Sequence, residues 1–307
     1  MKILAPASNL EDAKQLVDNG AEAIYAGAVS MVFKNYSYNG RSMLSKKGKL
    51  ISPDFTELKR IYEYVHSKGG DAYFLANSPF LYDGQDKESK LASGFLDYIH
   101  QGRLAGCDYI VLGDIGAIKL IRDTFPDAAV VASSYLEIQN ELSLKFFEDL
   151  GVKQVILSYQ STMDEINYMT SISTMDIEVF GHGGCSFYVG SCNLFHEMGE
   201  QPINVGYPCR AVYHIRYENR KIDNFRVLDN FKICSLCSLP NLLKCNVKTF
   251  KIVGRDLDSE YILQLVKIYK NAINEVQSGK RIEDIKEKLP VWWRKAWCEP
   301  GCLCKYR

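Results

Sequence analysis

Four of the ten cysteines in this 307-residue chain have the types of neighbours and the spacing expected of a ligand set. They are Cys185, Cys192, Cys209 and Cys234, and they lie in glycine-rich or polar segments rather than in apolar runs. Four thiolates from spaced loop positions can occupy the corners of a tetrahedral metal site or bind an iron–sulfur cluster. The pattern therefore predicts a protein that binds a metal ion or a cluster.

The spacing of these thiols leaves the identity of the metal open. Zinc sites favour paired Cys-x2-Cys knuckles, and only Cys234 and Cys237 have that spacing. The six residues between Cys185 and Cys192 suit neither a zinc ribbon nor a ferredoxin loop. Because four thiolates serve two-iron, four-iron and zinc centres alike, the thiol count does not choose among them.

A second group of thiols lies downstream of the first. Its members are Cys237, Cys245, Cys298, Cys302 and Cys304. Three of them belong to the tail, residues 290–307, where a polar chain end seldom builds a fixed core. We predict a second metal site that uses the tail with Cys237 or Cys245, and solvent-exposed redox thiols are the alternative. Cys107, which leads into an apolar run, is interpreted as a small buried side chain.

Short apolar runs alternate with amphipathic stretches of helical length, which is typical of a parallel sheet connected by helices. The predicted strands are residues 2–5, 23–26, 71–76, 109–112, 129–132, 154–158, 176–180 and 250–253. The predicted helices are residues 9–19, 54–68, 89–105, 115–124, 140–150, 161–171 and 259–277. Asn9 and Asn140 have the position of helix N-caps. Eight strands in this order predict a closed TIM-like (β/α)8 barrel.

One connection is too long for a barrel loop. Residues 181–249 follow the seventh strand and contain all four cysteines of the first set, so we predict a cysteine-rich insertion there. Active sites of such barrels lie at the carboxyl ends of the strands, where this insertion begins. Residues 30–52 form a second long loop, which is either functional or simply a surface loop. We expect residues 1–307 to form one barrel domain.

Composition excludes several classes of protein. The 37 basic and 37 acidic residues balance, which is unlike the basic footprint of a dedicated nucleic-acid binder, although a local basic patch is compatible with it. The start of the chain lacks the pattern of a secretory signal, and no run of about 18 apolar residues could span a bilayer. We expect a cytoplasmic protein without membrane insertion, whose cysteines are reduced or bound to metal.

Several stretches together resemble peptidase family U32. The motif Glu-x-Phe-x-x-Gly followed by Cys-x4-Gly-x-Cys is matched by Glu178, Phe180, Gly183, Cys185, Gly190 and Cys192, with one residue fewer between Gly183 and Cys185. Residues 4–11, 20–27 and 250–255 extend the resemblance over most of the chain. The family pattern has an acid where this chain has Val253, directly before Gly254 and Arg255.

The resemblance implies a cofactor and an activity. Studied members are associated with a four-iron (4Fe-4S) cluster held at positions that match Cys185, Cys192, Cys209 and Cys234. The family includes proteins that support oxygen-independent hydroxylation of quinone precursors, transfer RNA or ribosomal RNA, with prephenate as an implied oxygen donor. The substrate is therefore expected to be an RNA or a small aromatic molecule. Because some relatives work in pairs, a related partner chain is also expected.

Three residues near the predicted cluster are candidates for catalysis. His182 stands at the end of the seventh strand, where its ring could donate a proton or hydrogen-bond a sulfur, or simply cap the strand. Glu178 points inward from that strand, and a buried carboxylate there needs a partner such as Arg255 or another inward charge. Arg255 follows the eighth strand and could bind a carboxylate bidentately.

Two other classes of function stay open. The family name suggests a peptidase, but the chain has neither a Gly-x-Ser-x-Gly elbow nor a His-Glu-x-x-His motif. A Cys185–His182 pair is conceivable, yet a thiolate that binds a cluster cannot also attack an amide. The third class is a non-catalytic metal-binding subunit of a complex.

Overall fold

A computed structural model describes residues 1–29, 52–77, 90–184, 213–218, 220–225, 233–254, 257–301 and 304–306. Eight parallel strands close into a barrel in the order β1-β10-β7-β6-β5-β4-β3-β2. Their bounds are β1 Lys2–Pro6, β2 Ala23–Ala26, β3 Asp71–Leu75, β4 Tyr109–Leu112, β5 Ala129–Ala132, β6 Gln154–Ile156, β7 Asp176–His182 and β10 Thr249–Ile252. The predicted TIM-like (β/α)8 barrel is confirmed, and each predicted strand is present within two residues of its expected ends.

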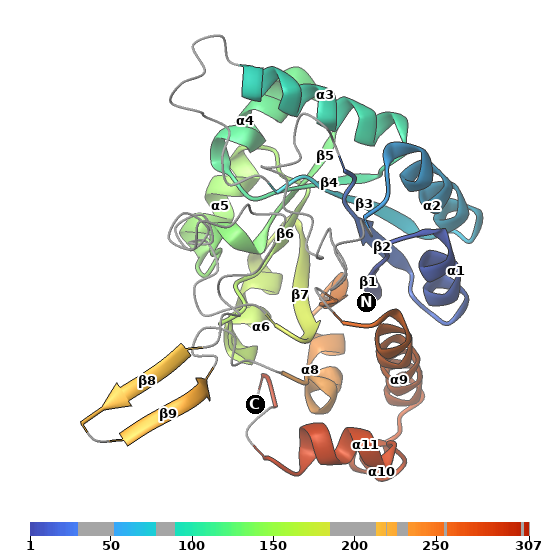
Figure 1. Ribbon diagram of the computed structural model, residues 1–307, viewed down its shortest axis with the longest axis vertical. Helices are drawn as coiled ribbons and strands as arrows, with labels where there is room; N and C mark the ends of the chain where they lie inside the picture. The colour runs from blue at the N-terminus through green and yellow to red at the C-terminus, as the bar shows by residue number, and fades with distance from the viewer. Residues whose placement is uncertain are drawn as a thin grey trace.

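Helices follow the strands and surround the barrel (Figure 1). They are α1 Leu10–Asp18, α2 Phe55–Ser67, α3 Lys90–Leu104, α4 Ile115–Thr124, α5 Glu141–Asp149, α6 Met163–Ile172, α8 Leu239–Lys244 and α9 Ser259–Gln277. Asn9 caps α1 by accepting from the Asp12 amide at 2.8 Å. Asn140 caps α5 within a reciprocal capping box with Ser143. Both predicted caps are therefore confirmed.

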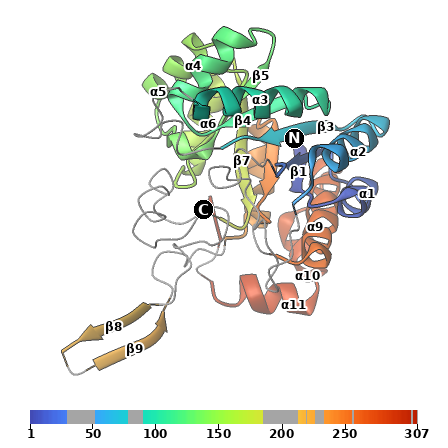
Figure 2. The same ribbon diagram turned by 45° about the horizontal axis from the view of Figure 1, so that its top comes forward.

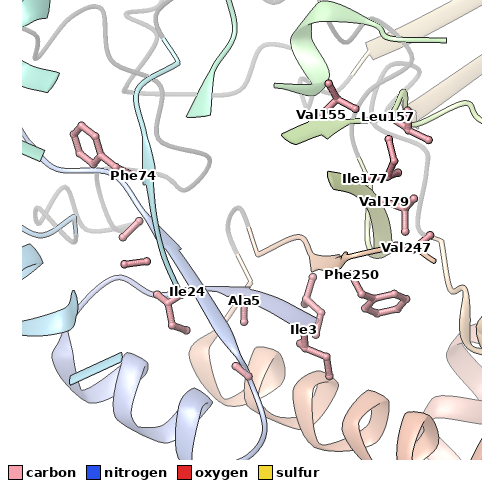
Figure 3. Close-up of a cluster of buried hydrophobic side chains, with 14 of the residues drawn as sticks. Ile3, Ala5, Ile24, Phe74, Val155, Leu157, Ile177, Val179, Val247 and Phe250 are labelled. Carbon is pink, nitrogen blue, oxygen red and sulfur yellow. The ribbon is translucent and has the colours of Figure 1, made fainter. Parts of the chain in front are cut away.

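The largest buried cluster lies between strands and helices. Ile3, Ile24, Phe74, Val179 and Phe250 belong to it and are fully or almost fully buried (Figure 3). Successive residues of a strand point to opposite faces, so these side chains pack under the helices while their neighbours fill the barrel. This layer holds the strand ends in fixed positions at the mouth of the barrel.

The interior of the barrel holds a second cluster with a polar centre. Glu178 is 0% exposed, and its Oε1 lies 3.2 Å from Nζ of Lys251. Gln154 donates to the other carboxylate oxygen at 2.7 Å, and Tyr73 donates to Gln154 at 3.0 Å. Nζ of Lys251 also lies 4.8 Å from the centroid of the Tyr25 ring. Each of these buried polar groups therefore has a partner.

The insertion after β7 contains a hairpin, β8 Tyr213–Tyr217 and β9 Arg220–Phe225, and returns to the barrel through α8. Figures 1 and 2 both show the hairpin projecting away from the barrel. After α9 the chain forms α10 Ile282–Glu287, and the tail begins with α11 Val291–Trp293 and a π-helical turn, Arg294–Cys298. No helix in the described ranges is both long and apolar enough to traverse a bilayer.

Candidate functional site

Cys234 is fixed against the carboxyl end of β7. Its backbone forms an isolated antiparallel β-bridge with that of His182, and the amide of Gly183 donates to the carbonyl of Ile233 at 3.1 Å. Gly184, the last described residue of this stretch, immediately precedes Cys185 in the chain. Cys234 is thus held at the mouth of the barrel, beside the backbone that leads into the predicted ligand Cys185, which suits a thiolate site.

The sulfur of Cys234 has a defined polar neighbour. The side chain is 4% exposed, and burial raises the pKa of its thiol to about 12. The hydroxyl of Tyr269 lies 3.7 Å from Sγ as a donor, and this hydroxyl is 2.9 Å from Nδ1 of His182. Metal binding at Cys234 would require loss of the thiol proton, which a bound cation favours strongly.

His182 lies on the helix side of β7 rather than inside the barrel. Its ring contacts Tyr269, Trp293 and Trp297, with centroid separations of 5.5, 5.2 and 4.5 Å. It is 1% exposed, and burial lowers the pKa of the imidazole to about 3. The His182 ring reaches the sulfur of the predicted cluster ligand Cys234 through the Tyr269 hydroxyl, which is the position of a supporting residue.

A strand irregularity explains this orientation. Phe180 belongs to the cluster inside the barrel, and strict alternation would place His182 on the same face. The register between β10 and β7 shifts at this point, because Lys251 pairs with Phe180 but Ile252 pairs with His182. The bulge turns the His182 ring outward.

Glu178 has a partner, and it is another inward charge: Lys251. Burial raises the pKa of the Glu178 carboxyl, and Lys251 opposes that shift. The other predicted site residues, Cys185, Cys192, Cys209 and Arg255, lie outside the described residues, as do Cys302 and most of the 30–52 loop. The catalytic and ligand roles assigned to all of them stay predictions.

The second group of thiols divides between two places. The backbones of Cys304 and Cys234 form an isolated parallel β-bridge, and thiolates at Cys237 and Cys304 would raise the pKa of the Cys234 thiol. Cys245 instead donates to Asn167 on α6 at 3.4 Å. Among the residues that the structure describes, no three His, Cys, Asp or Glu side chains are grouped to hold a metal ion. The second metal site stays a prediction.

The tail brings a residue to the site that the sequence did not single out. Nζ of Lys305 lies 3.9 Å from the ring centroid of Tyr159 and 4.7 Å from that of Tyr306. Burial lowers the pKa of the Lys305 ammonium to about 7. Lys305 stands between Cys304 and Tyr306 in a segment without the hydrophobic periodicity of a strand or helix. The sequence therefore contains no signal for its position.

Comparison with known proteins identifies the family. The sequence model that defines peptidase family U32 matches residues 8–297 of this chain. The chain belongs to peptidase family U32. Among solved structures, the U32 peptidase Mk0906 aligns with a TM-score of 0.50 and 17% identity, over 75% of this chain and 90% of that one. This likeness concerns the fold.

Curated relatives of this U32 chain carry names of two kinds. It is 24% identical to the uncharacterized protease MJ0090 of Methanocaldococcus jannaschii, over 97% of this chain and 72% of that protein. It is 22% identical to the 23S rRNA 5-hydroxycytidine C2501 synthase of Escherichia coli, over 90% of this chain but only 40% of the synthase. It is also 22% identical to tRNA hydroxylation protein P of Escherichia coli, over 91% of this chain and 69% of that protein.

Proposed function

We propose that this U32 protein is an iron–sulfur enzyme that hydroxylates RNA with a small organic oxygen donor in place of molecular oxygen. Cys185, Cys192, Cys209 and Cys234 would hold a 4Fe-4S cluster at the mouth of the barrel. The observation that carries the proposal is the attachment of Cys234 to the end of β7, beside the backbone that leads into Cys185. A cluster bound there would supply redox chemistry, and the surrounding residues would bind and orient the substrate.

The names of relatives support RNA as the substrate, and so does the β8–β9 hairpin. Arg216, Arg220 and Lys221 are exposed on it, and Tyr217 is 69% exposed at its turn. Basic side chains bind phosphates and an exposed ring can stack on a base, so this hairpin has the composition of an RNA contact despite the neutral chain. A small aromatic or quinone precursor is the other candidate substrate.

Metal analysis of anaerobically purified protein tests the cofactor. We expect about four irons and four sulfides per chain, with the absorption and EPR spectra of a 4Fe-4S cluster. The Cys185→Ala and Cys234→Ala variants should lose them. Cys107→Ala is the matched control, because Cys107 packs beside the main hydrophobic core and should leave the metal content unchanged. Stoichiometric zinc in the wild-type protein would contradict the proposal.

Nucleoside analysis tests the reaction itself. RNA from a strain that lacks the gene should lose one hydroxylated nucleoside, and plasmid-borne wild-type protein should restore it whereas Cys234→Ala should not. Arg216→Glu/Arg220→Glu should bind RNA about tenfold more weakly with a smaller salt dependence, because two phosphate contacts are removed. Unchanged RNA modification in the deletion strain would overturn the assignment.

A peptidase is the second candidate function, favoured by the family name and by the protease name of the Methanocaldococcus jannaschii relative. The position of His182 counts against a Cys185–His182 pair, because that ring is buried among aromatic side chains and bonded to Tyr269. Peptide cleavage by metal-free protein that a thiol reagent abolishes would favour the peptidase.

The proposal of an RNA-hydroxylating enzyme includes three further parts: a related partner chain, direct contact of Arg255 with the substrate and a cytoplasmic location.

A further inference from the structure

The last residues of the chain are docked on the mouth of the barrel. The amide of Lys305 donates to the carbonyl of Cys234 at 2.9 Å, and the hydroxyl of Tyr306 donates to the carbonyl of Phe180 at 2.9 Å. Ser238 donates from its hydroxyl to the carbonyls of Lys305 and Tyr306, at 2.7 and 3.1 Å. The tail is therefore held by β7 and by the segment that carries Cys234.

The docked tail adopts a backbone conformation that costs free energy. Tyr306 has a φ of +61°, in the left-handed region that a bulky side chain rarely occupies. Hydrogen bonds to its own carbonyl from Ser238 and from its own hydroxyl to Phe180 hold it there, and Tyr306 itself is 8% exposed. Backbone strain of this kind persists only where surrounding contacts determine it, and it is concentrated at binding and catalytic sites.

This conformation places the ammonium group of Lys305 on the face of Tyr159. Tyr159 follows β6, is 5% exposed and packs edge-on against Phe180 from β7, with centroids 5.6 Å apart. The Tyr159 ring also covers Gly184, where an added Cβ would lie 2.4 Å from a ring carbon. Lys305 is thus fixed directly beside the backbone that enters the predicted cluster-binding segment.

The charge of Lys305 is not balanced within the described part of the chain. No carboxylate there forms an ion pair with it, whereas the other inward lysine, Lys251, has Glu178 at 3.2 Å. Two aromatic faces offset part of the cost of burying an ammonium group, but they do not neutralise it. When it is protonated, a fixed and partly buried ammonium group in such a place is suited to receive an anion.

We propose that Lys305 is an anion-binding residue of the barrel mouth and receives a carboxylate or phosphate group of a small co-substrate that reacts with the RNA. The inference deepens the proposed function by assigning substrate binding to the tail, and it rests on that function only for the identity of the reaction. A small oxyanion fits better than an RNA backbone because the ammonium is enclosed by Tyr159 and Tyr306 rather than displayed on an open surface.

Calorimetric titration with citrate and with inorganic phosphate tests the proposal, with ionic strength held constant by potassium chloride. Lys305→Met removes the charge and keeps the length of the side chain, whereas Lys305→Arg keeps the charge. Lys295→Met is the control, because Lys295 is exposed in the same tail. We expect saturable binding by wild type, a loss of about tenfold or more in Lys305→Met, and a change of no more than about threefold in the other two variants.

The two titrations distinguish a carboxylate ligand from a phosphate ligand. Tighter binding of citrate indicates a carboxylate substrate, and tighter binding of phosphate indicates a phosphorylated one. Equal binding by wild type and Lys305→Met, or no saturable binding of either probe by wild type, would overturn the proposal. So would tighter binding of a short RNA than of either probe, with a loss of at least about tenfold for that RNA in Lys305→Met, which would assign Lys305 to nucleic acid.

Iron content measured on the same preparations distinguishes this proposal from the proposed function. Lys305→Met should retain the iron of the wild-type protein. Loss of iron in that variant would assign Lys305 to the metal centre and overturn the substrate-binding role. Absence of iron from wild type, together with anion binding that depends on Lys305, would overturn the cluster and leave the anion site standing.

Discussion

The interior of the barrel and its mouth above β6 and β7 both contain buried charged side chains. The two regions differ in whether each charge has a partner of opposite sign among the described residues. Inside, Glu178, Lys251, Gln154 and Tyr73 form a connected network in which each charge or amide meets a partner. At the mouth, Lys305 lies on aromatic faces without an acidic partner among the described residues. Folding requires that buried charges have partners, so a charge with no acidic partner among the described residues is the candidate for binding a ligand.

The largest expected effect comes from breaking the balance inside the barrel. Glu178→Gln should lower the free energy of unfolding by about 3 kcal/mol or more, because it leaves Lys251 buried without its counter-charge. Urea denaturation measures this loss. Glu22→Gln is the matched control, since Glu22 pairs with Lys270 at the surface, and it should cost less than about 1 kcal/mol. Equal losses in the two variants would contradict the comparison.

The boundary between the two regions is the bulge in β7, and Gly181 permits it. A Cβ at this position would lie 2.1 Å from a ring carbon of Phe250, which is fully buried. Gly181→Ala should therefore cost about 1–3 kcal/mol through overpacking. Adding Phe250→Leu should recover part of that loss, so the double variant would be more stable than the sum of the single effects predicts. Strict additivity would show that the ring is not the obstacle.

The same bulge marks where prediction from sequence ended. Apolar runs such as residues 109–112 and 129–132 located strands to the residue, because a parallel strand buried on both faces has a continuous apolar signature. The predicted strand ends at residue 180, and simple continuation of its alternation would put His182 on the face of Glu178 and Phe180, which the bulge paired with β10 prevents. Pairing between strands distant in sequence leaves no local signal.

Residues of the candidate site could be predicted from the sequence only where they belong to a local motif. Cysteine spacing directed attention to Cys234, and the structure attaches that residue to the end of β7. Tyr269 and Lys305 had no such pattern: one lies within the apolar face of α9, and the other lies in a tail whose position depends on hydrogen bonds to Cys234 and Phe180. Residues recruited by tertiary contacts become visible only when the fold is known.

A smaller effect is expected from Tyr269, which connects His182 to Cys234. Tyr269→Phe removes the donor to the Cys234 sulfur and the partner of His182 Nδ1, so it should lower the free energy of unfolding of metal-free protein by about 1–2 kcal/mol. Tyr64→Phe is the control, because the exposed Tyr64 hydroxyl bonds Asp18 at the surface and its loss should cost less than about 0.5 kcal/mol. No difference between the two variants would remove Tyr269 from a supporting role.

The smallest effect on stability is expected at Lys305, where the effect on binding should be large. Lys305→Met loses a cation–π contact but also removes a partly buried charge that no described carboxylate balances. These terms oppose each other, so the free energy of unfolding should rise by no more than about 1 kcal/mol or stay unchanged. Urea denaturation in a buffer free of phosphate and carboxylates measures it. A loss as large as that of Glu178→Gln would mean that Lys305 is balanced like the charges inside the barrel and is retained for the fold rather than for a ligand.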